Sequence, residues 1–316
     1  MGVLLTIESL TVAFEVAHPV VRDVSLSVSE GETLALVGES GSGKSVTAQT
    51  LLGLNPTAKV LSGKICFREH NLLTLDKKRR RSLCGRTMGY VFQDPYTALN
   101  PTMKIGKQVT EGMCYHLGFS RSQAYQDAVS LLRQLEFSDP ERILNSYPHA
   151  LSGGMRQRIV LAIALACSPE LLIADEPTTA LDPTVRSEIL SLLIKLQQKR
   201  QMSLILITHD LAIVPHLANR VAVMYAGQLV ETGTVKQVWS SPQHPYTQAL
   251  LEGNLTLNQD KSLPLKTIKG QIPSHKDLPA GCPFHPRCPY KQGKCLTNPP
   301  ESAIRCWFPL RGAHAR

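Results

Sequence analysis

The spacing of apolar and polar residues changes several times along the chain, and each change predicts a structural element. Apolar and polar residues alternate at 5–14 and again at 24–28, with turn residues between them, which predicts antiparallel strands. The short apolar run 33–37 leads into a glycine-rich loop, and residues 45–53 have helical spacing that ends at a glycine. The first part of the chain is therefore expected to form antiparallel strands followed by a strand, a loop and a helix.

The middle of the chain alternates between helical patterns and short apolar runs. Helical spacing is present at 121–135, at about 154–166 and at 185–200. The apolar runs 171–174 and 204–208 end in acidic or polar residues, as buried parallel strands do. Strands that alternate with helices predict a parallel sheet covered by helices.

Residues 38–45 form a glycine-rich motif between an expected strand and an expected helix. They read Gly-Glu-Ser-Gly-Ser-Gly-Lys-Ser, which fits the phosphate-binding pattern G-x-x-x-x-G-K-[ST]. Glycines let backbone N–H groups turn toward phosphates, Lys44 reaches the β and γ phosphates, and Ser45 binds Mg²⁺. A glycine-rich turn before a helix is the alternative. The expected ATP contacts in this loop are Gly38, Ser40, Gly41, Ser42, Gly43, Lys44, Ser45 and Val46.

Two carboxylates, Asp175 and Glu176, follow the apolar run 171–174. Ligands of open α/β sheets bind at the carboxyl ends of strands, where this pair is expected to lie. Asp175 is expected to bind Mg²⁺, and Glu176 to polarise the attacking water as a general base. A solvated strand end or a helix cap is the preferred interpretation of an isolated Asp-Glu pair, but the phosphate-binding loop reverses that preference.

Several motifs together resemble a known family. Residues 151–158, Leu-Ser-Gly-Gly-Met-Arg-Gln-Arg, resemble the signature sequence of ABC-type ATPases. The resemblance also includes Gln93, the segment Ala180-Leu181-Asp182 and His209, and it extends over residues 1 to about 253. It implies an α/β fold, the P-loop ABC-type ATPase cassette, with an antiparallel β subdomain, a RecA-like parallel-sheet core and a helical subdomain.

The resemblance also implies roles for individual residues. Nucleotide domains of this family pair head to tail, so ATP lies between the loop of one and the signature of the other. Gln93, Glu176 and His209 are the implied catalytic residues, and Gln93 joins Ser45 and Asp175 around Mg²⁺. The residues implied to contact the nucleotide of the partner domain are Ser152, Gly153, Gly154, Gln157 and Asp182.

Phe14 aligns with the aromatic residue that stacks on adenine in this family, although the family more often has Tyr there. A core phenylalanine is the alternative interpretation. In transporters of the family, the segment 94–108 that follows Gln93 faces the membrane subunits. ATP binding and hydrolysis then move those subunits between inward-facing and outward-facing states.

Composition limits the class of protein. Of the 316 residues, 43% are hydrophobic and 19% are charged, which fits a folded globular chain and excludes a collagen-like or largely disordered one. No apolar run reaches the roughly 18 to 20 residues that a membrane span needs, and the N-terminus has no signal-peptide pattern. These features predict a cytoplasmic chain, and the resemblance to transporters implies a peripheral subunit at the cytoplasmic face of the inner (plasma) membrane.

The positive charge is concentrated in the last part of the chain. The formal net charge is +9, and residues 254–316 supply +7 of it, together with four of the eight cysteines. This shift in composition predicts a boundary near residue 254. The expected domains are an ABC nucleotide-binding domain at 1–253 and a short Cys-rich C-terminal extension at 254–316.

The four cysteines of the extension are Cys282, Cys288, Cys295 and Cys306. In a cytoplasmic chain this density indicates a metal site, and zinc, an iron–sulfur cluster and free thiols all stay open on spacing alone. Residues 244–251 and 281–289 resemble the C-terminal extension of oligopeptide and dipeptide importer ATPases. In that subfamily four cysteines can hold a 4Fe-4S cluster, which the resemblance assigns to these four positions.

The resemblance therefore implies the ATP-hydrolysing subunit of a bacterial ABC importer for dipeptides or oligopeptides. Its implied partners are a second, related ABC ATPase, two transmembrane permease subunits and an extracytoplasmic substrate-binding protein. Import of nickel or a metal chelate by the same machinery is an alternative, as is a soluble ABC ATPase acting on nucleic acid. The basic run 77–81 is interpreted as a solvated helix face and not as a nucleic-acid site, because it lacks interleaved aromatic residues.

Overall fold

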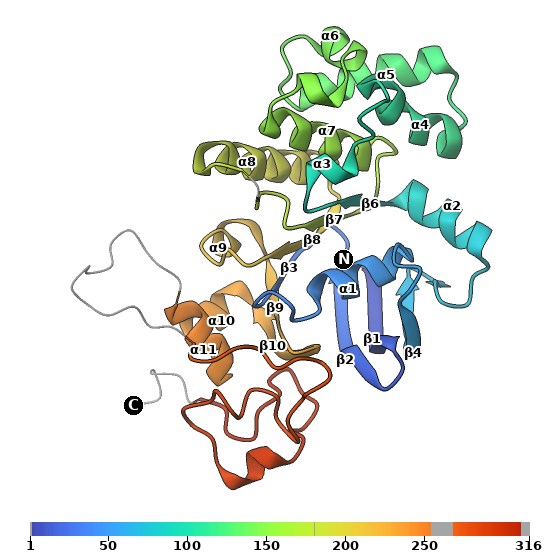
Figure 1. The fold of residues 1–316 in the computed structure, drawn as a ribbon. Coiled ribbons are helices and arrows are strands. Elements are labelled where there is room, and N and C mark those ends of the chain that lie inside the picture. Colours follow the sequence, from blue (N-terminus) through green and yellow to red (C-terminus); the bar gives the residue numbers. More distant parts are fainter. Residues whose placement is uncertain (1, 180, 254–267, 311–316) are drawn as a thin grey trace. The chain divides into compact units, whose positions relative to one another are not determined.

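The computed structural model describes residues 2–179, 181–253 and 268–310 (Figure 1). The chain divides into two compact units. Unit 1 comprises Met1–Leu73 and Ile207–Arg316, and unit 2 comprises Thr74–Leu206. The boundary expected near residue 254 lies at the start of 254–267, outside the described residues.

An antiparallel sheet forms the first part of unit 1. Its strand order is β2-β1-β4-β5. The apolar residues that alternate along the first strand are buried, and this strand pairs with its neighbours on both sides, for example Ile7 with Leu26 and Ile65. The antiparallel strands expected at the start of the chain are therefore confirmed. The strands are β1 (Val3–Glu15), β2 (His18–Ser29), β4 (Lys59–Phe67) and β5 (His70–Asn71).

A second group of strands in unit 1 has the order β10-β9-β3. Strand β3 (Thr33–Val37) is buried at every position and pairs in parallel with β9 (Arg220–Tyr225), which pairs antiparallel with β10 (Gln228–Thr234). The helix expected after the glycine-rich loop is present as α1 (Lys44–Leu52) and ends at Gly53. The other helical segments of unit 1 are α9 (Val214–Leu217), α10 (Val235–Ser240), α11 (Pro245–Glu252) and the 3-10 turn η2 (Gly293–Leu296).

Unit 2 contains the strand order β8-β7-β6. Strands β6 (Met88–Val91) and β7 (Leu171–Asp175) are parallel, and β8 (Ser203–Thr208) carries the chain across the division into unit 1. Every residue of these three strands is buried, which explains their continuous apolar runs. The expected parallel sheet with helices is therefore confirmed.

The helices of unit 2 include those that helical spacing predicts. α4 and α5 pack against each other and against both α6 and α7, and α7 also packs against α8 and β6. In α5 the helix begins after Ser120, whose hydroxyl accepts from the backbone N–H of Gln123 in a capping box. The helical segments are α2 (Lys77–Thr87), α3 (Pro95–Ala98), α4 (Ile105–Leu117), α5 (Arg121–Gln134), α6 (Pro140–Asn145), η1 (Pro148–Ala150), α7 (Gly153–Leu165) and α8 (Pro183–Arg200).

The described part of the extension, residues 268–310, packs into the core of unit 1. The aromatic rings of Tyr225, Tyr246 and Phe284 lie against one another, with ring centroids 4.6 to 5.3 Å apart. Arg305 forms an ion pair with Asp23 of β2. The extension has little regular secondary structure, so these contacts fix its position.

In the part of the chain that the structure describes, every helix is too short or too polar to cross a lipid bilayer.

Candidate functional site

The glycine-rich loop connects β3 to α1 within unit 1. Gly38 has a φ of 151°, and a Cβ at this position would lie 2.2 Å from the carbonyl oxygen of Met224. Gly43 has a φ of 101° and precedes the first residue of α1. Both positions require glycine because a side chain would strain the backbone, and the first would also clash with β9. The loop is thereby held close to the strands that support it.

Lys44 lies under the loop and is 5% exposed. Its Nζ donates to the carbonyl oxygens of Gly38 and Glu39, at 2.9 Å each, and lies 3.4 Å from the Oγ of Ser42. Phosphate oxygens are stronger acceptors than these carbonyls, so the ammonium group can exchange one set of partners for the other. Together with the N-terminus of α1, this arrangement is suited to bind the phosphates of a nucleotide.

Two further expected residues of unit 1 lie at strand ends. Phe14 is near the end of β1 and is 39% exposed, so the alternative of a core phenylalanine is wrong. Its ring has a free surface on which a nucleotide base can stack. His209 directly follows β8 and is exposed, whereas the preceding Thr208 is buried.

In unit 2 the carboxylates Asp175 and Glu176 stand at the end of β7, as expected. Asp175 is 3% exposed, and its Oδ2 accepts a hydrogen bond of 2.7 Å from the hydroxyl of Tyr90 on β6. An acceptor-only carboxylate in a buried setting is a suitable Mg²⁺ ligand, directly or through water. Tyr90 holds this carboxylate from the neighbouring strand.

Glu176 has an unusual backbone conformation. Its φ is 47°, in the left-handed region that residues other than glycine rarely adopt. The Oε2 atom accepts one hydrogen bond from the Nε2 of Gln93 and another from the Oγ1 of Thr179, both at 2.9 Å. A strained backbone and two donors to one oxygen orient this carboxylate, as is common at functional sites.

The signature residues form the N-terminus of α7. The hydroxyl of Ser152 accepts from the N–H of Met155, and Ser152 is exposed. A Cβ at Gly154 would lie 2.7 Å from the Cγ1 of Val185, because α7 and α8 approach closely there. The exposed Asp182 caps α8 by accepting from the N–H groups of residues 184 and 185. Ala180 lies outside the described residues.

Gln157 differs from the other signature residues. It is 1% exposed, and within the described ranges its Nε2 atom has no hydrogen-bond partner. Because Gln157 is buried, its side chain does not present a surface to a second subunit in this structure. The expectation that Gln157 contacts the nucleotide of a partner domain therefore does not fit its position, whereas Ser152 and Asp182 are accessible.

The expected residues thus fall into two groups. Unit 1 brings together the residues of the loop 38–45, and it also contains Phe14 and His209. Unit 2 joins Gln93 to Glu176 by a hydrogen bond and contains Asp175 and the signature.

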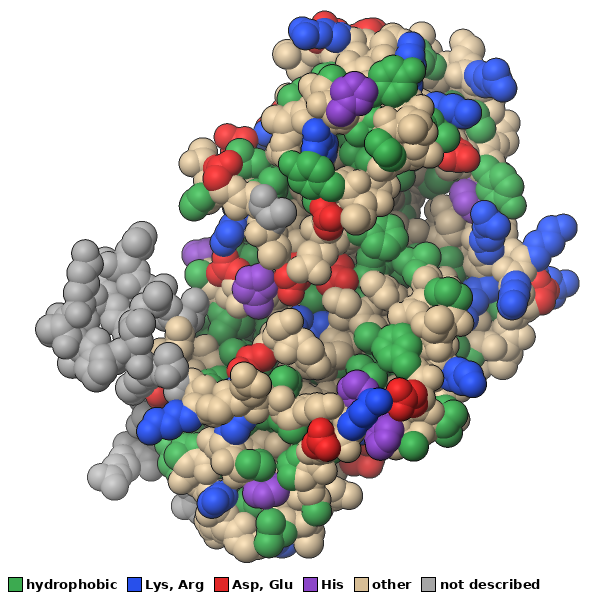
Figure 2. Space-filling view, viewed as in Figure 1, with side chains coloured by type: hydrophobic (Ala, Val, Ile, Leu, Met, Phe, Trp, Pro, Cys, Tyr) green, Lys and Arg blue, Asp and Glu red, His purple; other side chains and the backbone are tan. Residues whose placement is uncertain are grey.

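The basic run 77–81 lies on α2 and is largely exposed to solvent, as the sequence suggested. Most of its Lys and Arg side chains are exposed, and Figure 2 shows them at the edge of unit 2 formed by α2. The guanidinium of Arg81 lies 5.8 Å from the ring centre of Tyr115 on α4. This run is a solvated helix face.

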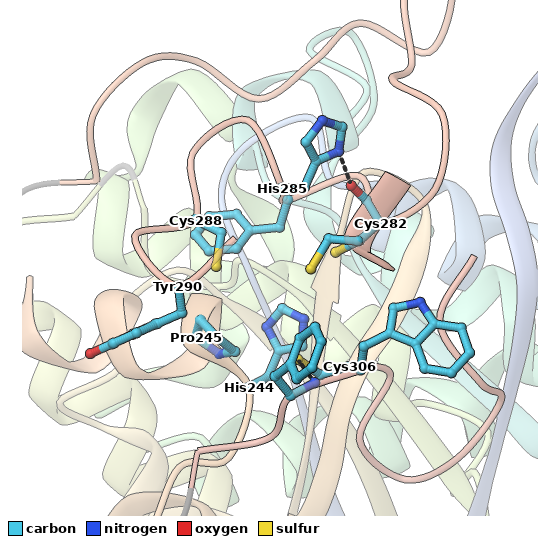
Figure 3. Close-up of a pocket in the computed structure, with 11 residues that line it drawn as sticks. His244, Pro245, Cys282, His285, Cys288, Tyr290 and Cys306 are labelled. Atoms are coloured by element: carbon cyan, nitrogen blue, oxygen red, sulfur yellow. Dashed lines mark hydrogen bonds between the residues drawn. The ribbon is translucent and has the colours of Figure 1, made fainter. Parts of the chain in front are cut away.

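The four cysteines of the extension line one pocket (Figure 3). Cys282 and Cys295 are buried, and the backbone N–H of Cys282 donates to the carbonyl of Cys295. Cys288 and Cys306 also line the pocket, as does His244. The spacing along the sequence therefore corresponds to a spatial cluster, which we call the cysteine pocket.

Burial raises the pKa of three of these thiols. It raises the pKa of Cys282 to about 11, and the neighbouring thiols contribute to the same change. The pKa values of Cys288 and Cys306 are also raised, chiefly by burial. Without a bound cation these three side chains are neutral thiols at pH 7, and metal binding would release their protons.

His244 places an unsatisfied donor at the cysteine pocket. It is 1% exposed, and its Nδ1 accepts from the backbone N–H of Tyr246, so the ring proton is on Nε2. Within residues 2–179, 181–253 and 268–310, this Nε2 has no hydrogen-bond partner. Burial lowers the pKa of His244 to about 3, and the nearby backbone of Arg305 opposes this effect only in part. The pocket therefore combines four sulfur ligands with one buried N–H group.

The arrangement does not match a site for a single ion. Among the described residues, no group of three or more His, Cys, Asp or Glu side chains is placed to hold one metal ion. A tetrahedral zinc site with Zn–S bonds of about 2.3 Å requires sulfur atoms within ~4 Å of one another. In a four-iron cluster each thiolate binds a different iron, so the sulfur atoms are farther apart.

Some residues at these sites were not identified from the sequence. Tyr90 and Thr179 orient the two carboxylates, and Arg287 contacts Glu39 of the loop. A tyrosine in an otherwise apolar strand was a usable signal, because a buried hydroxyl needs a partner. The ion pair between residues 39 and 287 had no local signal.

Comparisons with known proteins agree with this geometry. The ABC transporter family model matches residues 21–179, and the model of the oligopeptide/dipeptide transporter C-terminal region matches residues 230–295. The chain is similar to the dipeptide transport ATP-binding protein DppD of Escherichia coli K12, with 44% identity over 98% of both chains. It is also similar to the oligopeptide transport ATP-binding protein AppD of Bacillus subtilis, with 45% identity over 98% of this chain and 97% of the relative.

Solved structures support the same assignment. The ATP-binding cassette MJ0796, determined as a dimer bound to ADP and Pi, has a TM-score of 0.65 at 26% identity. It covers 73% of this chain and 98% of its own length. The structure of cbiO1 from Clostridium perfringens, part of an ABC transporter complex, has a TM-score of 0.66 at 28% identity and covers 75% and 91%. This chain belongs to the ABC transporter family and is one of its ATP-hydrolysing cassettes.

Proposed function

We propose that this chain energises the import of dipeptides or oligopeptides by hydrolysing ATP. The observation that carries the proposal is its similarity, over nearly the whole length, to dipeptide and oligopeptide transport ATP-binding proteins. The match extends into the C-terminal region of such transporters, which a cassette of another class would not need. An intact phosphate-binding loop and the oriented carboxylate of Glu176 support the enzymatic part.

In this proposal each site residue has a defined task. The loop 38–45 binds the phosphates of ATP, Phe14 stacks on adenine, and Val46 adds a contact from α1. Ser45, Gln93 and Asp175 would supply the ligands for Mg²⁺. The loop residues proposed to contact ATP are Gly38, Ser40, Gly41, Ser42, Gly43, Lys44 and Ser45.

Hydrolysis then needs a base and an activated water. Glu176 accepts a proton from the water as its oxygen attacks the γ-phosphorus, and ADP leaves with the bridging oxygen. His209 contacts the γ-phosphate and orients the water. The hydrogen bonds from Gln93 and Thr179 to Glu176 support this role, because they orient its carboxylate.

The active form in this proposal is a head-to-tail pair with a second, related ABC ATPase. Ser152, Gly153, Gly154 and Asp182 contact the nucleotide held by the partner. The exposure of Ser152 and Asp182 supports these contacts, as does the dimeric state of the related cassette MJ0796. Gln157 is left out of the direct contacts because it is buried.

The assembly proposed around this pair contains two transmembrane permease subunits and an extracytoplasmic substrate-binding protein. The chain itself is placed at the cytoplasmic face of the plasma membrane as a peripheral subunit. The segment 94–108 after Gln93, which includes α3 and the start of α4, faces the permease and transmits nucleotide-driven motion. We propose the ranges 1–253 for the nucleotide-binding domain and 254–316 for the extension.

Transport by the reconstituted complex tests this function. The complete complex in vesicles should accumulate a labelled dipeptide or oligopeptide in an ATP-dependent manner. Accumulation of nickel or a nickel chelate, but not of peptide, would assign the cassette to metal import. A stable complex of the purified chain with DNA, together with no co-purifying permease, would overturn the transporter assignment.

We also propose that the cysteine pocket holds a 4Fe-4S cluster. The fit rests on the four cysteines that line one pocket and on the buried Nε2–H of His244, an unsatisfied donor that sulfur acceptors would satisfy. Cys282, Cys288, Cys295 and Cys306 would hold it. When bound, the cluster would supply a cross-link between segments of the extension that have little secondary structure.

Purification without oxygen tests the cluster. The expected product is brown and contains about four iron atoms and four acid-labile sulfides per chain. A colourless protein with one zinc per chain would reject the cluster, and a protein that binds neither metal would leave four free thiols.

A further inference from the structure

Arg287 of the extension forms an ion pair with a residue of the phosphate-binding loop. Its Nη1 lies 2.7 Å from one carboxylate oxygen of Glu39, and its Nη2 lies 3.0 Å from the other. This two-point contact fixes both the distance and the orientation of the carboxylate. It joins a residue directly before Cys288 to the second residue of the loop motif 38–45.

The Arg287 guanidinium is also held by contacts other than the one with Glu39. Its remaining donors contact the carbonyl oxygens of residues 268, 269 and 270 at 3.0 to 3.4 Å, and Nη1 also donates to the Tyr225 hydroxyl. Only 6% of the Arg287 side chain is exposed, against 30% for Glu39. Burial alone lowers the pKa of Arg287, but Glu39 and Tyr225 together raise it above its usual value. Arg287 is therefore a rigid, permanently charged partner.

Glu39 is held at its backbone as well as at its carboxylate. Its N–H donates to the hydroxyl of Tyr246 on α11, at 2.9 Å. Its carbonyl accepts from the Nζ of Lys44 and from the N–H of Ser42. Tyr246 and Arg287, from the C-terminal part of the chain, thus hold the backbone N–H and the carboxylate of Glu39. The carbonyl of Glu39 contacts residues of its own loop.

We propose that Arg287 is a positioning residue for nucleotide binding, which holds the phosphate-binding loop in its receptive conformation through Glu39. In this view the folded extension is part of the apparatus that binds ATP, although it lies outside the cassette motifs. The chain of contacts is short: Arg287 fixes the Glu39 carboxylate, and the Glu39 carbonyl accepts from the backbone N–H of Ser42 within the loop. The inference rests on ATP binding by this loop, which titration of the unaltered protein tests separately.

The alternative is that Arg287 only anchors the extension. A matched anchor is available in Arg305, which is also poorly exposed, lies in the extension and forms an ion pair with Asp23 of β2. Asp23 is outside the phosphate-binding loop. Loss of Arg305 should therefore weaken the attachment of the extension without changing the loop.

The test measures binding of a fluorescent ATP analogue by the full-length chain and ATP hydrolysis by the assembled complex. Arg287→Ala should raise the Kd and the KM for ATP about tenfold, because the receptive loop is then populated only about a tenth of the time. The kcat should be nearly unchanged, since the variant leaves Glu176 and its donors in place. Arg287→Lys should give an intermediate Kd, because lysine keeps the charge but loses the two-point geometry.

The control and the pairwise test decide between the two roles. Arg305→Ala should lower the melting temperature but leave the Kd for ATP within about twofold of the unaltered protein, because Asp23 is not part of the loop. Glu39→Gln should weaken ATP binding, and adding Arg287→Ala to it should cause little further loss, since both changes break one contact.

Two outcomes would overturn the proposal. The first is an unchanged Kd in a folded Arg287→Ala protein. The second is an equal rise in Kd for Arg287→Ala and Arg305→Ala, which would assign both to anchoring. If the unaltered protein fails to bind the ATP analogue, the failure lies with the assigned ATPase function and not with Arg287.

Discussion

Glu176 shows how one residue can be prepared for its task before any ligand arrives. Its left-handed backbone turns the chain sharply after β7, and Gln93 and Thr179 both donate to the same carboxylate oxygen. A backbone of this kind costs of the order of 1–3 kcal/mol and persists only where surrounding contacts enforce it. This free-energy cost is consistent with a residue whose side-chain orientation is needed for function.

Replacement of Glu176 by Gln should therefore separate binding from chemistry. The amide is nearly isosteric and can still accept from Gln93, so ATP binding should persist, but it cannot accept the proton of water. Steady-state hydrolysis should fall by roughly 10²- to 10⁴-fold with little change in the Kd for ATP. Glu188→Gln, which alters an exposed carboxylate paired with Arg158, is the control. Unchanged turnover in Glu176→Gln would exclude this residue as the base.

His244 makes stability depend on pH. Its pKa is about 3 in the folded protein and about 6.5 in the unfolded chain, because burial disfavours the charged ring. The unfolded state therefore binds one more proton between these values, and stability falls as pH decreases through this window. The expected loss is ~1.4 kcal/mol per pH unit, or about 2 kcal/mol between pH 6.5 and pH 5.

Chemical denaturation at several pH values measures this effect. His244→Asn keeps an acceptor for the Tyr246 N–H at the start of α11 but cannot titrate, so its stability should depend less on pH between 6.5 and 5. The exposed His70 provides the control, since His70→Asn should retain the full dependence. Equal pH dependence in both variants would contradict the role of His244.

At the scale of elements, the close approach of α7 and α8 depends on a glycine of the signature. A methyl group at Gly154 would lie 2.7 Å from Val185, and valine has little freedom to move away. The expected overpacking cost of about 1–3 kcal/mol exceeds the gain of up to ~1 kcal/mol from replacing glycine in a helix. Gly154 therefore has a packing role in addition to its proposed contact with nucleotide.

A pair of substitutions separates the packing role from the functional one. Gly154→Ala should lower the free energy of unfolding by about 1–2 kcal/mol, and in a Val185→Ala background the same change should cost much less. Denaturant unfolding measures both. If Gly154→Ala destabilises the protein equally in the two backgrounds, contact with Val185 does not limit the size of residue 154.

The sequence was most informative where an element depends on its own residues. The apolar run 33–37 coincides with β3, and the helical spacing at 121–135 matches α5 to within one residue. The basic run 77–81 is interpreted as a helix face, but the bounds of α2 could not be predicted from apolar spacing, because Cys84 is its only buried residue and it has no apolar stripe. The spacing of apolar residues reports only on helices that bury a face.

Some features of the candidate site could likewise be predicted from adjacent residues, and others could not. The loop 38–45 and the pair Asp175-Glu176 are contiguous motifs, so their chemistry could be inferred from adjacent residues. The positive φ of Glu176 and the burial of Gln157 depend on packing against other segments, which no local pattern encodes. For the same reason the contact between Arg287 and Glu39 became visible only in the folded chain.

Across the whole of unit 1, the extension contributes to the core that supports the loop. Phe284 is 1% exposed and lies against Tyr225 of β9 and Tyr246 of α11. An aromatic ring in such a position normally contributes several kcal/mol of stability. The extension therefore behaves as part of the core and not as an appended module.

Truncation of this ring tests the assignment. Phe284→Ala should lower the free energy of unfolding by about 3–5 kcal/mol, because it leaves a cavity between two tyrosines. Leu296→Ala, at a position that is 59% exposed, should change stability by less than ~0.5 kcal/mol. Thermal and denaturant unfolding of the two variants should differ accordingly. If Phe284→Ala is as stable as the unaltered protein, the Phe284 ring does not contribute to the core of unit 1.

The order in which the ribosome makes this chain gives the link between Glu39 and Arg287 a further consequence. The two residues are 248 positions apart, and the continuous stretch of unit 2 lies between them. At about 5–20 residues per second, Arg287 is synthesised some 12–50 s after Glu39. Unit 2 can be synthesised completely during this interval, whereas the ATP-binding loop must wait for the extension before its last support is made. A translation product arrested before Arg287 would therefore carry every cassette motif and still lack a fully organised phosphate-binding loop.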